Sequence, residues 1–317
     1  MKYLKKFTKH NNYSAFIVGS VFKNLEKDNV SFCKSEQHVH YNVYVPPIPK
    51  FLDILYSDAD GNLKFTDEVL PVSEGKTPIA LCIAAQGFFG ENEKARWMSL
   101  KYMNYTTPDT GSLTLQNMKW GNGTDITTID NISYLYDGFY YNWGYYTADW
   151  ITGTNNKVPP LWDENGNWNL SILGTINMYG ATDIDGKNKT IKIIDTATSQ
   201  ENWRTDESIV NISDAGYTPA ACCCWRYHTL GTKSGNWYLG ACGEMSIIVV
   251  QKPAINNKLA AISALYPNDC ISTIYNNDYW TSTEYSNKNV FTNGFTGGTF
   301  GLSSKTDNRS TFAMLQY

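Results

Sequence analysis

Three stretches decide the fold of the last third of the chain: residues 236–245 read NWYLGACGEM, residues 254–256 read AIN, and residues 279–285 read YWTSTEY. The first predicts a strand that runs into a helix beginning near Gly243. The second lies on a helix that continues after Pro253, with apolar residues at helical spacing. The third is rich in aromatic and β-branched residues and predicts another strand. The expected order is strand, helix, helix, strand.

An antiparallel meander is expected after these elements. Strands are predicted at residues 279–283 and 290–295, and Gly297-Gly298 predicts a tight hairpin turn into a strand at residues 299–302. Residues 310–317 form a last predicted strand. The C-terminal part therefore combines β structure, two helices and a meander.

The chain before these stretches is predicted to be mainly β. Residues 51–56 and 63–65 flank a turn rich in Asp, Gly and Asn, which favours a hairpin. An Asp-Ile-Asp-Gly turn precedes a predicted strand at residues 190–194. One further helix is expected at residues 219–228, with Thr218 as N-cap and a proline in the first helical position. The fold class is therefore α+β, mostly β.

The three stretches resemble a known family, the C-type-lectin-like domains of the formylglycine-generating-enzyme type. Members of this family include the variable proteins of diversity-generating retroelements. Their usual pattern has a WYLPS-GEL strand and helix, a helix with IN-AL and a YWSSTEY strand. Gly240 stands where the pattern prefers proline, and Thr281 where it prefers serine. The resemblance implies a C-type-lectin-like domain with two helices and a C-terminal antiparallel meander.

The resemblance covers residues 201–317 well. Residues 76–150 are expected to supply the first strands of the same domain, and residues 151–200 are then a probable insertion. The residues that fit the family's tail pattern are Phe295, Gly298, Lys305 and Ala313.

The domain organisation follows from a change in composition near residue 50. Pro46-Pro47-Ile48-Pro49 predicts an extended, stiff linker. Residues 1–49 are therefore expected to form an N-terminal attachment or oligomerisation segment, and the resemblance described in the next paragraph implies that it attaches the chain to a virion. Residues 50–75 are expected to form a β-hairpin connector, and residues 76–317 the lectin-like domain.

The N-terminal segment carries a second resemblance. Residues 4–7 (LKKF), 29–33 (NVSFC) and 39–42 (VHYN) are similar to the start of structural proteins encoded by crAss-like phages and related elements of gut Bacteroidetes. This resemblance implies a virion component. The start of the chain is positively charged, but the polar residues after it do not form the apolar region of a signal peptide.

Composition and charge exclude some function classes. The net charge is −4, and the lysines and arginines are scattered, so a nucleic-acid partner is not expected. The sequence has no apolar run of about 18 residues, so membrane insertion is not expected. The chain has 22 Tyr, 13 Phe and 10 Trp, residue types that serve β cores, interfaces and sugar-facing surfaces.

Catalysis and cofactors are not expected. The seven cysteines have no regular framework and predict buried free thiols. His228 is the only histidine in the C-terminal half, so no pair of base and nucleophile can be assembled. Cys33, His38 and His40 suggest a zinc site, but no fourth ligand is evident. The calcium signature of sugar-binding animal lectins is missing. No cofactor and no metal are therefore expected, and the protein is expected not to be an enzyme.

The expected function is ligand binding by the exposed side of the meander. In the retroelement-diversified members of the family, this region contacts ligands, and strand alternation would turn intervening apolar residues into the core. A cluster of aromatic residues at 138–146 is a second candidate surface for glycan stacking or subunit contact. The residues that the family pattern places at the ligand are Tyr285, Asn287, Lys288, Asn289, Phe291, Asn293, Thr299, Gly301, Ser303 and Thr306.

These expectations describe a phage virion surface protein, either a head fiber or a decoration protein, made in the cytoplasm of the host bacterium. Its expected partners are itself, as a trimer in preference to a dimer, other virion proteins through residues 1–49, and a polysaccharide or protein of the host cell surface. Two alternatives stay open: a tail fiber or receptor-binding protein, and a bacterial cell-surface adhesin of the same fold.

Overall fold

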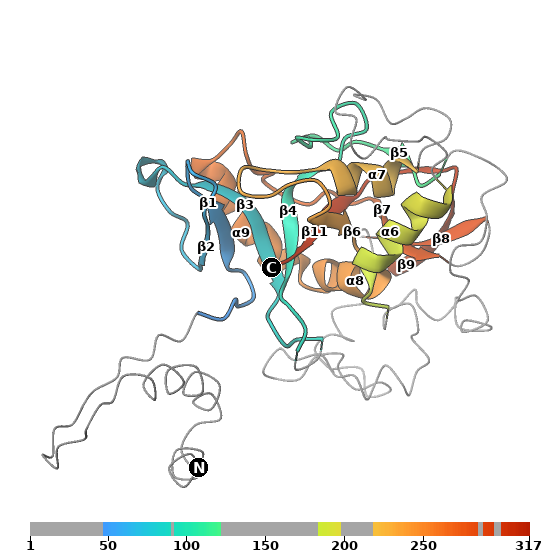
Figure 1. Cartoon of the computed structure of the whole chain (residues 1–317), viewed down its shortest axis with the longest axis horizontal. Helices are drawn as coiled ribbons and strands as arrows, with labels where there is room; N and C mark the ends of the chain where they lie inside the picture. Colours follow the sequence, from blue (N-terminus) through green and yellow to red (C-terminus); the bar gives the residue numbers. More distant parts are fainter. Residues whose placement is uncertain (1–46, 90–91, 122–182, 198–217, 285–287, 295–298) are drawn as a thin grey trace, which may run out of the picture. The chain divides into compact units, whose positions relative to one another are not determined.

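The computed structural model describes residues 47–89, 92–121, 183–197, 218–284, 288–294 and 299–317 (Figure 1). The chain divides into two units between Pro46 and Pro47. Residues 1–46 lie outside the described residues, so the attachment segment stays a prediction. The described part is mostly β with a few helices, and its sheets are antiparallel, as the sequence predicted.

A six-stranded sheet forms the base of the domain, with strand order β2-β1-β3-β4-β11-β6 (Figure 1). Its strands are β1 (Ile54–Ser57), β2 (Leu63–Thr66), β3 (Thr77–Ala84), β4 (Arg96–Tyr102), β6 (Trp237–Leu239) and β11 (Phe312–Gln316). The hairpin predicted at residues 50–75 forms as β1 and β2, and β1 also pairs with β3. The hairpin is therefore part of the main sheet.

The meander forms a separate three-stranded sheet from β7 (Asp278–Glu284), β8 (Asn289–Gly294) and β9 (Thr299–Ser304). The predicted strands at 279–283, 290–295 and 299–302 are confirmed within the described residues. The last predicted strand leaves the meander, because β11 pairs with β4 and β6 in the main sheet. Two short strands, β5 (Met118–Lys119) and β10 (Asn308–Arg309), pair with each other in a separate two-stranded sheet.

Three helices of the C-terminal part follow the sequence prediction. They are α7 (Pro219–Arg226), α8 (Cys242–Val250) and α9 (Lys252–Leu265), with a short 3-10 turn η1 (Val72–Glu74) earlier in the chain. Pro253 lies in the first turn of α9, where a missing backbone N–H costs nothing. None of the helices in the described part of the chain is long and apolar enough to cross a membrane.

The strand predicted at residues 190–194 is wrong, because these residues lie in helix α6 (Gly186–Ala197). The run Thr-Ile-Lys-Ile-Ile has high β propensity, but tertiary packing decides otherwise. Ile193 and Ile194 are buried on one side of the helix. The Thr190 hydroxyl lies 2.7 Å from the Gly186 carbonyl and 3.1 Å from the Leu239 carbonyl, and it accepts the Leu239 N–H at 2.9 Å. Helix α6 is thereby fixed against β6.

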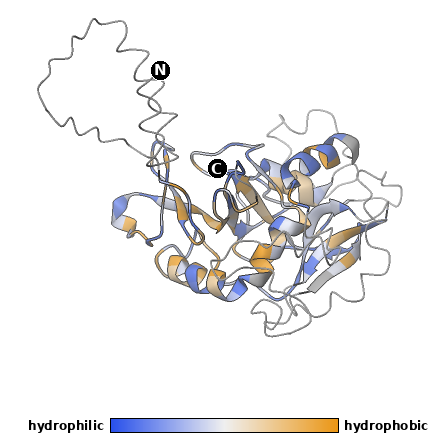
Figure 2. Ribbon diagram, turned by 90° about the horizontal axis from the view of Figure 1, so that it is seen from below, coloured by the Kyte–Doolittle hydropathy of each residue, from blue (hydrophilic) through white to orange (hydrophobic). Residues whose placement is uncertain are grey.

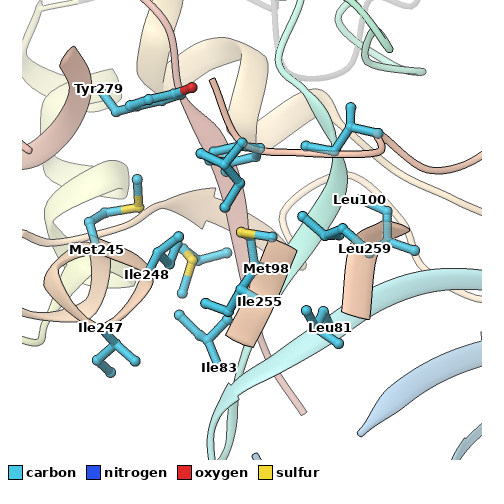
Figure 3. Packing of buried hydrophobic residues seen from close by; sticks show 14 of the residues in the cluster. Leu81, Ile83, Met98, Leu100, Met245, Ile247, Ile248, Ile255, Leu259 and Tyr279 are labelled. Carbon is cyan, nitrogen blue, oxygen red and sulfur yellow. The ribbon is translucent and has the colours of Figure 1, made fainter. Parts of the chain in front are cut away.

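The core consists of two clusters of buried hydrophobic residues. One includes Leu81 and Met98 of the main sheet with Ile248 of α8 and Leu259 of α9 (Figure 3). The other includes all three cysteines of α7 together with strand residues of the main sheet and Trp280. Hydrophobic and hydrophilic residues are interleaved along the helices and strands, as expected for elements with a buried side (Figure 2).

Buried free thiols were predicted, and they are confirmed for the described cysteines: Cys82, Cys222, Cys223, Cys224, Cys242 and Cys270 are all free and buried. Cys33 lies outside the described residues. The thiols act as small apolar side chains within the core.

Glu244 organises the 236–245 stretch. One carboxylate oxygen accepts Nε of Arg96 at 2.6 Å and the hydroxyl of Tyr238 at 2.8 Å, and the other accepts the backbone N–H of Ala241 at 2.9 Å. Arg96 and Glu244 are both almost completely buried. Burial raises the pKa of Glu244 to about 7, although Arg96 and the hydrogen bonds act in the opposite direction. This glutamate thus connects β4, β6 and the first turn of α8.

Candidate functional site

Strand β7 carries polar side chains that fix the meander to its surroundings. The Thr281 hydroxyl donates to the Phe291 carbonyl at 2.8 Å, which ties β7 to β8. The Thr283 hydroxyl accepts the backbone N–H of Cys242 at 2.8 Å and donates to Asp183 at 2.5 Å. These bonds connect β7 to the N-terminal end of α8 and to the residues before α6. The meander is therefore held on a rigid base.

Two buried tryptophans connect β7 with β5 and the residue after it through hydrogen bonds in both directions. The indole N–H of Trp120 donates to the Thr281 carbonyl at 2.9 Å, and the indole N–H of Trp280 donates to the Met118 carbonyl at 2.7 Å. Both tryptophans are 0% exposed. Each ring thus satisfies a backbone carbonyl on the opposite element, so the pair fixes the distance between the two strands.

A buried ion pair lies at the C-terminal end of β7. Lys305 donates to Glu284, both side chains are 1% exposed, and the ammonium lies 4.8 Å from the centre of the Trp120 ring. Burial lowers the pKa of Lys305, and Glu284 opposes this shift. The backbone of Lys305 also accepts the N–H of Gly121 at 3.0 Å and donates to the Lys288 carbonyl at 2.9 Å. One residue therefore joins the ends of β7 and β9 to the loop before β8.

The ligand residues expected from the sequence do not share one surface. Lys288 and Thr306 are exposed, and Asn289 and Gly301 are partly exposed. Tyr285 and Asn287 lie outside the described residues. Thr299 pairs with Gly294 through its backbone, and its side chain lies outside what the structure describes.

Phe291, Asn293 and Ser303 are not surface residues, and their assignment to the ligand surface is corrected. They are only 4%, 0% and 5% exposed. Phe291 belongs to the core cluster that includes α8. The Asn293 amide donates to the Cys242 carbonyl at 3.3 Å, and its oxygen accepts the Cys242 thiol at 3.5 Å.

Both faces of β8 are covered, which explains the error. Phe291 lies in the core cluster around α8 and α9, whereas Val290 lies in the cluster with Trp280. Ser303 pairs with Val290 across the β8–β9 ladder and shares its covered face. Alternate side chains of β8 therefore point into two different hydrophobic clusters. The sequence alone predicted one buried face and one face exposed to solvent.

Burial and exposure differ among the cysteines and the histidine that the sequence offers for catalysis. Burial raises the pKa of Cys270 to about 12 and the pKa of Cys242 well above its usual range, so both thiols are protonated at neutral pH. His228 is exposed, and its Nδ1 lies 3.0 Å from the Arg226 carbonyl. Within the described ranges no group of His, Cys, Asp and Glu could hold a metal ion. Cys33, His38 and His40 lie outside them, as does the 138–146 cluster.

One exposed feature was missed by the sequence analysis. Tyr275, between α9 and β7, is 49% exposed and is followed by Asn276, Asn277 and Asp278. The sequence signal is an aromatic residue followed by two amides and an acid, Tyr275 to Asp278. This run has no periodicity that marks it as exposed.

Comparisons with known proteins give little similarity. No protein-family model matches the chain, and no curated protein matches it significantly. A solved structure, that of a fimbrial protein from Bacteroides ovatus ATCC 8483, is 14% identical with a TM-score of 0.36. The match covers 85% of this chain and 49% of that one, so this chain spans about half the length of that protein. The likeness is too weak to carry an argument about fold or function.

Proposed function

We propose that the chain is a non-enzymatic surface protein of a phage virion, a head fiber or decoration protein, which displays a C-type-lectin-like domain to the host surface. The observation that carries the proposal is that the three family-like stretches are all built into the framework of the fold. Glu244 links β4, β6 and α8, the side-chain oxygen of Asn256 accepts the Ile274 N–H at 2.9 Å, and Trp280 locks β7 to β5.

Such a framework suits presentation of variable loops. The buried Trp120–Trp280 pair and the Lys305–Glu284 pair fix the ends of the meander strands. Lys288 and Thr306 are exposed next to these anchors. Binding residues are often carried by loops on a rigid scaffold, because recognition can then change without loss of the core. The proposed ligand is a polysaccharide or protein of the host cell surface.

The binding part of the proposal is tested on host cells with the full-length chain. Replacing Lys288 and Thr306 together by Ala should alter adsorption to cells while it changes the melting temperature by less than about 2 °C, because both side chains are exposed. Replacing the buried Asn293 by Ala should lower stability instead. If the double variant adsorbs as well as the wild type, Lys288 and Thr306 do not contact the ligand.

The virion part of the proposal rests on residues 1–49, with their resemblance to phage structural proteins and their proline linker. Deleting these residues should abolish incorporation into particles and leave residues 50–317 folded, as judged by circular dichroism. Normal incorporation of the truncated chain would contradict the anchor assignment.

The class of protein is tested by its location. Mass spectrometry of purified particles and of a host membrane fraction should find the chain in the particles. Enrichment in the membrane fraction would favour the alternative of a bacterial adhesin.

A trimer is proposed for the full-length chain, and a monomer in light scattering at micromolar concentration would contradict it.

A further inference from the structure

Tyr275 is presented at the surface as a rigid ring. Its ring stacks on Tyr102, with centroids 6.1 Å apart and planes 24° from parallel. Its backbone N–H donates to the Tyr102 hydroxyl at 3.1 Å, and its carbonyl accepts the Tyr279 hydroxyl at 3.0 Å. Tyr102 and Tyr279 are 0% exposed, whereas Tyr275 is 49% exposed. A ring that is fixed before binding loses little entropy when a ligand covers it.

Polar side chains extend from this ring along the surface. The Asn276 side-chain oxygen accepts Lys252, and the Asn277 amide donates to the side-chain oxygen of Asn117 at 3.2 Å. Asp278 lies 3.5 Å from Arg309, which also lies 3.6 Å from Asp307. These residues form what we call the tyrosine–amide patch: Tyr275, Asn276, Asn277, Asp278, Asn117 and Arg309.

The patch has the chemistry of a sugar-binding surface. The open face of a tyrosine ring can cover the apolar C–H face of a hexose, while amides, carboxylates and a guanidinium hydrogen-bond with its hydroxyls. Arg309 is paired with Asp278 of the patch and with the adjacent Asp307, and the Lys252 ammonium donates to Asn276. Two positive groups thus stand beside two negative groups, so these side chains create no net positive field that would select phosphate or acidic sugars. The occupant that fits is an uncharged sugar.

We infer that the tyrosine–amide patch binds neutral hexose units of a surface polysaccharide, with Tyr275 as the stacking platform. The inference rests on the proposed host-binding function and places a contact beside the start of β7. Asn277 and Asp278 then orient the sugar through its hydroxyl groups.

The test measures binding of the full-length chain to an array of purified neutral and acidic bacterial surface polysaccharides. Tyr275→Ala should weaken binding to the neutral polysaccharides at least tenfold, Tyr275→Phe should stay within about twofold, and Asn277→Ala should weaken it about fivefold, since each removes a different contact. Tyr317→Ala is the matched control, because Tyr317 is 42% exposed and lies outside the patch.

Each outcome decides between the two proposals. Full binding by Tyr275→Ala overturns the patch, and so does binding restricted to acidic polysaccharides. If the wild-type chain binds host cells through a protein and no polysaccharide, the patch is wrong and the proposed function stands. If the wild-type chain binds neither cells nor polysaccharides, both proposals fail. Melting temperatures of all variants within about 2 °C of the wild type exclude misfolding as the cause.

Discussion

Three of the four fully buried tryptophans in the described part of the chain show how differently an indole N–H is used. Trp120 and Trp280 donate to backbone carbonyls, whereas the indole nitrogen of Trp97 has no hydrogen-bond partner within the described part of the chain. All three side chains are 0% exposed. A buried donor without a partner costs about 1–3 kcal/mol, so Trp97 contributes less than its buried area indicates.

Replacement by phenylalanine should separate these two kinds of tryptophan. Trp280→Phe leaves the Met118 carbonyl without its donor, while Trp97→Phe removes a donor that had no acceptor. Both changes delete a similar volume. We expect Trp280→Phe to cost about 1–3 kcal/mol more than Trp97→Phe in urea denaturation. Equal costs would mean that volume alone decides at both positions.

Glu244 should make stability depend on pH. Its pKa is near 4.5 in an unfolded chain and about 7 in the folded protein, because burial disfavours the charge. Folding therefore favours the protonated form. The stabilisation from this group is complete below pH 4.5 and is lost as pH rises through 7, a change of about 3 kcal/mol.

The measurement compares the wild type with Glu244→Gln, whose side chain does not titrate. The difference in free energy of unfolding between the two proteins should change by about 3 kcal/mol between pH 4.5 and 8, to the disadvantage of the wild type. Glu74→Gln is the control at a half-exposed glutamate. A difference that stays constant would show that Arg96 keeps Glu244 ionised over the whole range.

Secondary-structure elements could be predicted from sequence where one side of each element is polar and the other apolar. Helix α9 has Ile255, Leu259 and Ile262 buried at helical spacing, and its position was predicted. Helix α6 was missed because its β-branched residues are typical of a strand, whereas its packing against β6, β7 and α7 favours the helix. The pairing of β11 with β4 and β6 is equally non-local, and nothing in residues 310–317 predicts it.

The meander that carries the expected ligand residues could be predicted, but the burial of those residues only in part. The meander and its exposed Lys288 and Thr306 were found, because turn residues and alternation mark them. The burial of Phe291 and Asn293 could not be predicted, since it depends on which elements cover each face of β8. Tyr275 was missed because exposure of an aromatic residue leaves no periodic signal.

Gly186 provides a test of the placement of α6. A Cβ atom there would lie 2.4 Å from a carboxylate oxygen of Glu244 and 2.6 Å from the Ala241 nitrogen. Glycine to alanine normally stabilises a helix by up to about 1 kcal/mol. Here Gly186→Ala should instead cost about 1–3 kcal/mol, since backbone atoms must move. Asn188→Ala, an exposed position on the same helix, should be neutral or stabilising. A stabilised Gly186→Ala protein would place α6 farther from α8.

On the scale of the whole molecule, the two ends of residues 122–182 are attached to the same part of the fold. Gly121 donates to Lys305, whose side chain binds Glu284. Asp183 accepts the hydroxyl of the neighbouring Thr283 and the N–H of Gly243. Both attachment points are therefore linked to consecutive residues of β7, whose side chains lie on opposite faces of the strand.

We predict that the domain tolerates replacement of residues 122–182 by a flexible Gly-Ser linker of about twelve residues, whose root-mean-square span is about 20 Å. Shortening the connection about fivefold lowers the entropy cost of closing it by about 1 kcal/mol, so the melting temperature should stay constant or rise by a few degrees.

A full-length variant with serine at Tyr140, Tyr141 and Trp143 serves as the matched control. Binding to host cells by both variants would exclude the 138–146 cluster as the ligand surface, and loss of binding by both with unchanged melting would assign the ligand to it. Failure of the linker variant to fold would show that residues 122–182 are part of the core.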